Sequence, residues 1–98
     1  MGVNYKIVVD GREHDLAFVG INNANPLCIV VLLQIKETED EWLSEWINDI
    51  SITNLTHSKI EIENEYFSII LNRVNDINVF KMSHNFVAIA FKFKELDN

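Results

Sequence analysis

The longest apolar run in the sequence, Leu27 to Leu33, most constrains how this chain can fold. It contains the β-branched segment Ile29-Val30-Val31 and no alternation of apolar and polar residues. Such a run is typical of a central strand buried on both faces, although periodicity alone does not distinguish it from a buried helix. It is far too short to span a bilayer as a helix. The sequence therefore predicts a core strand over Leu27 to Ile35.

The composition is that of one globular domain. The chain has 98 residues, of which 48% are hydrophobic, and its single Pro and three Gly leave no material for a flexible linker. A chain of this length normally forms one domain with one core. We therefore expect residues 1–98 to fold as a single unit.

The segment before the apolar run indicates a hairpin. Tyr5, Ile7 and Val9 alternate with other residues, and the turn dipeptide Asp10-Gly11 follows them. We expect a second strand over residues 16–21, joined to the first by a polar loop through Asp15. Residues 22–26 are predicted to be a loop, because Asn and Pro dominate them.

One helix is predicted after the apolar run. Thr38 and Glu41 have the spacing of a capping box, in which each side chain reaches the other residue's backbone amide. The apolar positions that follow recur at helical spacing and cover one face: Trp42, Leu43, Trp46, Ile47 and Ile50. We expect the helix to end between Ser51 and Asn54, and its apolar face to pack on a sheet.

The remaining chain reads as strands and turns. Residues 59–65 alternate strictly, and residues 66–71 either continue that strand or begin another after a bulge. Turns are expected at Asn75-Asp76 and at 83–85, with strands over 77–81 and 86–94. The element order β-β-β-α-β-β-β predicts an α+β domain: a mostly antiparallel sheet of about six strands with one helix on one face.

The charge favours a basic protein partner. Fifteen acidic and eight basic side chains give a formal charge of −7, and the basic residues are scattered along the sequence. Such a protein repels nucleic acid and anionic membranes, whereas opposite charge accelerates its encounter with a basic protein. The single cysteine, Cys28, allows no intrachain disulfide, and the N-terminus lacks a secretory apolar segment. We therefore expect a cytoplasmic protein.

The sequence contains no catalytic or metal-binding motif. His14, His57 and His84 fall in predicted turns or loops, without another His or Cys at ligand spacing. No phosphate-binding loop, nucleophile elbow or Cys-x-x-Cys pair is present. We predict no metal and no cofactor. A small enzyme remains as an alternative if the fold brings a His and a carboxylate together.

An acidic ridge on the predicted helix is the most informative feature for function. Glu41, Glu45 and Asp49 lie four residues apart and so share one side of the helix, beside Trp42. Like charges at this spacing repel, and the last two lie toward the negative end of the helix dipole. The ridge is either an ordinary solvated face or a binding surface in which Trp42 is a contact residue.

A second acidic row is Glu61, Glu63 and Glu65, which strand periodicity places on one face. Lys92 and Lys94 have the same spacing on the last predicted strand, so we expect the two strands to be neighbours and the charges to pair. Otherwise the row adds to an acidic surface or protects an exposed sheet edge.

In size, acidity and the acid–aromatic helix, the chain resembles bacterial immunity proteins, the small acidic antidotes of nuclease-type toxins. The residues that carry the resemblance are Glu41, Trp42, Glu45, Trp46 and Asp49. It implies a non-catalytic protein that covers the basic substrate cleft of a toxin and excludes nucleic acid. Three alternatives remain: a nucleic-acid mimic that inhibits a defence enzyme, a structural subunit that dimerises through a sheet edge, and the small enzyme.

Overall fold

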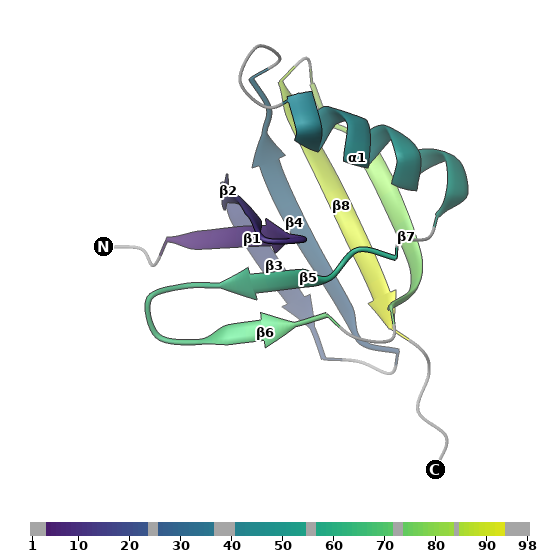
Figure 1. Ribbon diagram of the computed structural model, residues 1–98. Helices are drawn as coiled ribbons and strands as arrows, with labels where there is room; N and C mark the ends of the chain where they lie inside the picture. Colours follow the sequence, from purple (N-terminus) through teal and green to yellow (C-terminus); the bar gives the residue numbers. More distant parts are fainter. Residues whose placement is uncertain are drawn as a thin grey trace.

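In the described part of the chain, eight strands form two antiparallel sheets, and one helix packs beside them (Figure 1). The computed structural model describes residues 4–23, 26–36, 41–54, 57–71, 74–83 and 85–93. The elements are β1 (Tyr5–Val9), β2 (Arg12–Leu16), β3 (Phe18–Asn22), β4 (Cys28–Gln34), α1 (Glu41–Thr53), β5 (Ile60–Glu63), β6 (Ser68–Ile70), β7 (Val74–Lys81) and β8 (Phe86–Phe93). The predicted α+β class is confirmed.

The predicted single sheet is instead two sheets of four strands. The first sheet has the order β2-β1-β5-β6 and the second has the order β3-β4-β8-β7. The chain passes from one to the other at Ala17, whose N–H donates to the Leu32 carbonyl at 2.8 Å. Our prediction placed residues 16–21 in one strand, because their apolar character is continuous across this junction.

The turn at Asp10-Gly11 is confirmed, but the polar loop expected through Asp15 is not. Asp10 has φ 50° and Gly11 has φ 86°, which is the left-handed backbone of a two-residue hairpin turn. So tight a turn brings Arg12 directly opposite Val9, and the polar segment that follows becomes β2. Polar residues fit there because β2 is an edge strand.

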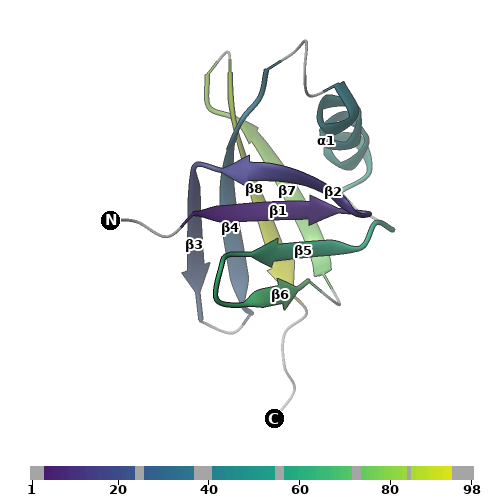
Figure 2. The same ribbon diagram turned by 60° about the vertical axis from the view of Figure 1, so that its left-hand side comes forward.

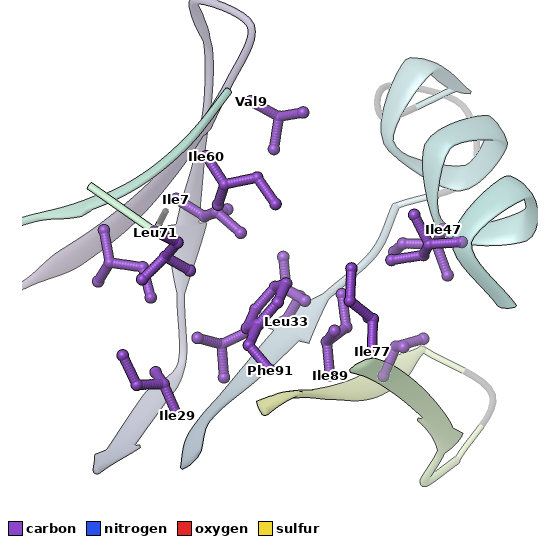
Figure 3. Packing of buried hydrophobic residues seen from close by; sticks show 14 of the residues in the cluster. Ile7, Val9, Ile29, Leu33, Ile47, Ile60, Leu71, Ile77, Ile89 and Phe91 are labelled. Carbon is purple, nitrogen blue, oxygen red and sulfur yellow. The ribbon is translucent and has the colours of Figure 1, made fainter. Parts of the chain in front are cut away.

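The core lies between the two sheets and extends under the helix (Figure 2). In the close view of Figure 3, Ile7 and Ile60 of the first sheet face Leu33 and Phe91 of the second. Most of the apolar side chains packed here are fully buried, and no polar or charged side chain of the described residues is buried. The two inner faces and α1 thus enclose one apolar interior.

The predicted helix and its buried face are confirmed. Leu43, Ile47 and Ile50 point into the core, and α1 packs against β7. The expected cap residue Thr38 lies outside the described residues. No helix in the described part of the chain is both long and apolar enough to cross a lipid bilayer.

The central strand expected at the apolar run is confirmed, but its burial on both faces is not. β4 lies between β3 and β8. Its inward residues Ile29, Val31 and Leu33 are buried, whereas Cys28, Val30 and Leu32 are only half-buried. The reason is that the helix and the first sheet cover the same side of the second sheet (Figure 1).

Two turns after the helix differ from the prediction. The strand expected over 59–65 ends at Glu63, because the Asn64 side chain accepts the N–H groups of Tyr66 and Phe67 and starts a hairpin to β6. Asn75-Asp76 is not a turn: it lies within β7, at a bulge between Val74 and Asp76. The β7–β8 connection at 83–85 is a turn, of which His84 lies outside the described residues.

Candidate protein-binding interface

The acidic ridge of α1 faces solvent. Glu41, Glu45 and Asp49 are all exposed, on the side of the helix opposite the buried Leu43. Within the described ranges, no Lys, Arg or His forms an ion pair with any of them. The repulsion between neighbouring carboxylates, about 0.2–0.5 kcal/mol for each pair at this spacing, is therefore not relieved by any described cation.

An exposed isoleucine lies on the same side of the helix, and the sequence analysis missed it. Ile52 is 73% exposed, the second-highest exposure among the large apolar residues. It follows Asp49 by three residues and Glu45 by seven, so the three side chains are neighbours on the helix surface. The signal was available in the sequence, since nine helical steps from Leu43 place Ile52 half a turn away from the core.

Trp42 lies at the border between the ridge and the core. It is half-buried and packs against the apolar interior. The guanidinium of Arg12, in β2, lies over its ring, 5.7 Å from the ring centre. Trp46 is also half-buried, but its indole Nε1 is fully covered and has no acceptor among the described residues. Trp42 is thus the aromatic residue that borders the ridge, as expected from its place at the edge of the apolar arc.

The expected pairing of the second acidic row with Lys92 and Lys94 is wrong. β5, which carries Glu61 and Glu63, pairs with β1 and β6, whereas Lys92 lies in the second sheet opposite Cys28 and Asp76. Lys94 lies outside the described residues. Glu65 does not continue the strand face, because it falls in the β5–β6 turn.

Other lysines balance part of this row. Lys59 Nζ lies 3.2 Å from Glu61, and Lys6 is directly opposite Glu63 in the neighbouring strand. Lys6 also lies 3.3 Å from Glu13, on β2. The outer face of the first sheet therefore combines Glu13, Asp15, Glu61 and Glu63 with two lysines. This surface is acidic but partly neutralised, in contrast to the ridge.

The candidate histidines are not gathered into a site. His14 lies in β2 rather than in a loop, with Nδ1 2.8 Å from the Asp15 carbonyl oxygen, and it lines a polar hollow with Lys6 and Lys36. His57 is exposed after the helix, and His84 lies outside the described residues. No cluster of three or more His, Cys, Asp or Glu side chains able to hold a metal ion occurs among the residues described.

Among the described residues, Asp10 has the one pKa that its surroundings shift clearly. The backbone N–H of Lys59 donates to Asp10 Oδ1 at 2.8 Å, and this bond lowers the pKa of the carboxyl, with a smaller contribution from the Ser58 side chain. Asp10 N–H in turn donates to the Lys59 carbonyl at 2.9 Å. These two bonds fasten the β1–β2 turn to the start of β5, so the lowered pKa has a structural cause.

Comparison with protein-family models, with curated proteins and with solved structures gave no match to this chain.

Proposed function

We propose that this protein is a non-catalytic binding module whose acidic ridge docks on a basic protein. In character it is an immunity protein that neutralises a nuclease-type toxin by covering the toxin's basic substrate cleft. Its binding residues are Glu41, Glu45 and Asp49, with Trp42 and Ile52 as the apolar contacts.

One observation carries the proposal: three exposed carboxylates without a described cation partner run along one side of α1, with the exposed Ile52 next to Asp49 and the half-buried Trp42 at their border. Charges steer association, while desolvated apolar and aromatic side chains supply most of the affinity of a typical interface. Ile52, 73% exposed beside Asp49, supplies an apolar contact next to the acids. The outer face of the first sheet is a secondary candidate, because Glu61 and Glu63 already have lysines beside them.

The test compares two charge reversals of equal size. The ridge variant carries Glu41→Lys, Glu45→Lys and Asp49→Lys. The control carries Asp15→Lys, Glu63→Lys and Glu65→Lys, which change the net charge by the same amount on and beside the outer face of the first sheet. A loss of binding confined to this variant would move the interface to that secondary candidate surface. The wild-type protein is used to capture partners from a native lysate, and the captured basic protein is assayed for nuclease activity with and without the wild-type protein.

Binding rates then decide the site. We expect the ridge variant to associate with the captured partner at least about tenfold more slowly at low salt, because steering depends on local charge. The control variant should retain most of the wild-type rate. An equal decrease of the association rate in both variants would show that only net charge matters. An unchanged association rate in the ridge variant would exclude the ridge as the interface.

A further inference from the structure

The outer face of the second sheet is apolar at its centre. Strand register places its members on the side away from the first sheet and α1: Phe18, Gly20 and Asn22 of β3; Cys28, Val30, Leu32 and Gln34 of β4; Phe86, Ala88, Ala90 and Lys92 of β8; Asp76, Asn78 and Phe80 of β7. We call this set the apolar sheet face. No described helix or strand lies over it (Figures 1 and 2).

The centre of this face is apolar, with Val30 and Leu32 of β4 beside Ala90 and Ala88 of β8, whereas the row at one end holds Asn22, Asp76 and Lys92. β4 has the unbroken apolar sequence of a strand buried on both sides, yet only its inner side is covered. Phe18 and Phe80, at the two edges of the sheet, are 57% and 53% exposed. The apolar residues between these two rings are half-buried, apart from Ala90, which is buried. The face therefore has two exposed aromatic rings on either side of a partly exposed apolar centre, and exposed apolar surface of this kind marks an interaction site.

The charge of the apolar sheet face indicates which kind of partner it binds. Asp76 and Lys92, directly opposite each other in β7 and β8, are the only charged residues of the apolar sheet face, so the face is neutral in a protein of charge −7. The outer face of the first sheet and the ridge are both acidic and repel a second copy. A basic partner would gain no electrostatic attraction from the apolar sheet face. A second copy meets no like-charge repulsion there, and we propose that the protein forms a dimer through this face.

The residue pattern is self-complementary. Phe18, Leu32, Ala88 and Phe80 form one line across the four strands. A two-fold axis that runs parallel to the strands, between β4 and β8, relates the two copies. It places Ala88 of the second copy over Leu32 of the first, and Phe18 of the second copy over Phe80 of the first. Large side chains then meet small ones at the centre, and aromatic rings meet at the rims, as in the packing of two sheets about 10 Å apart.

The area predicts a weak dimer. Four strands spaced about 4.8 Å apart and six residues rising about 3.3 Å each give a face of about 400 Å² in plan. This is smaller than the roughly 800 Å² of accessible surface that each partner buries in a standard stable interface. We therefore expect a dissociation constant of about 1–100 μM.

Sedimentation equilibrium tests the proposal. The mass of the wild-type protein should rise from that of one chain toward that of two between about 1 μM and about 1 mM. The variant with Phe18→Ser and Phe80→Ser should remain monomeric across this range. The control Phe67→Ser changes a ring that is 47% exposed on the β5–β6 turn and should dimerise like the wild type. Circular dichroism establishes that the variants are folded.

Two further measurements separate this dimer from other associations. Alkylation of Cys28, a member of the face, by excess iodoacetamide should slow as the protein concentration rises. Added salt should leave the dimer intact or tighten it, because salt screens the repulsion between two acidic chains, whereas binding of a basic partner weakens in salt. The ridge variant should still dimerise, so failure of the proposed function does not affect this test.

Three results would overturn the proposal: a wild-type protein that stays monomeric to about 1 mM, a Phe18/Phe80 variant that associates like the wild type, or a dimer that dissociates in salt. The first result would leave the apolar sheet face to a different protein, and the other two would place the interface elsewhere.

Discussion

Replacing Leu43 by alanine tests which side of α1 faces the core, and hence whether the acidic ridge is free to bind. Leu43 is fully buried against the sheets, whereas Ile52 on the same helix is 73% exposed. Truncating a fully buried leucine removes its transfer free energy and leaves a cavity, together about 2–5 kcal/mol. We expect Leu43→Ala to lower the free energy of unfolding by about 3 kcal/mol.

The matched control is Ile52→Ala. Truncating an exposed side chain leaves no cavity, and alanine has the higher helix propensity, so the free energy of unfolding should change by less than about 0.5 kcal/mol. The contrast between the two variants depends only on helix orientation, because both remove a large aliphatic side chain from α1.

Urea denaturation followed by tryptophan fluorescence is the assay, since both tryptophans lie in α1. With a urea dependence of about 1–1.5 kcal/mol/M, the loss expected for Leu43→Ala lowers the midpoint by about 2–3 M. Far-ultraviolet circular dichroism should give the same midpoint. Equal losses in the two variants, or a loss below about 1 kcal/mol for Leu43→Ala, would contradict the helix orientation on which the binding proposal rests.

Three other predictions concern the first sheet. Because the hydrogen bond from Lys59 lowers the pKa of Asp10, the carboxylate stabilises the fold above the unfolded pKa of about 3.9, and this stability is lost as the pH falls through the folded pKa. Asp10→Asn should therefore be less stable than the wild type in urea denaturation at about pH 7, with the difference disappearing near about pH 2. Gly11 has φ 86°, and no heavy atom lies within 4 Å of a Cβ added there. Gly11→Ala should therefore lower the free energy of unfolding by about 1 kcal/mol through backbone strain alone, which calorimetry would register as a decrease of about 4–8 °C in Tm. Gly11→Asn should lower it by less, because asparagine tolerates the left-handed backbone better. A double-mutant cycle of Arg12→Ala and Trp42→Leu should give a coupling of about 0.5–1 kcal/mol in the free energy of unfolding, the usual strength of an exposed cation–π contact, and a coupling near zero would show that the two residues do not interact.

Local sequence patterns predicted the local structure of this chain well. The Asp10-Gly11 turn and the buried face of α1 both follow from residue types and spacing. These features depend on neighbours within a few residues, where turn chemistry and helix or strand periodicity are decisive. The exposure of the acidic ridge follows from the same helical periodicity.

Strand pairing could not be predicted in this way. Periodicity places Glu61 and Glu63 on one face, but it does not show that Lys6, more than fifty residues earlier, lies opposite Glu63. Equal spacing of acids and lysines favoured Lys92 instead, which the division into two sheets puts in the other layer. That division occurs at Ala17, within a continuous apolar segment that carries no turn signal.

The outer side of β4 is less buried than its sequence predicts, and this difference has a physical meaning. Its apolar run predicts burial on two faces, and the single chain provides only one. A second copy on the apolar sheet face would supply the missing cover. The helix α1, which carries the acidic ridge, lies on the opposite side of the second sheet from the apolar sheet face, so dimerisation leaves both ridges free (Figure 1). The two proposals together therefore predict a complex of two copies with two basic partners, which added salt separates into free partner and intact dimer.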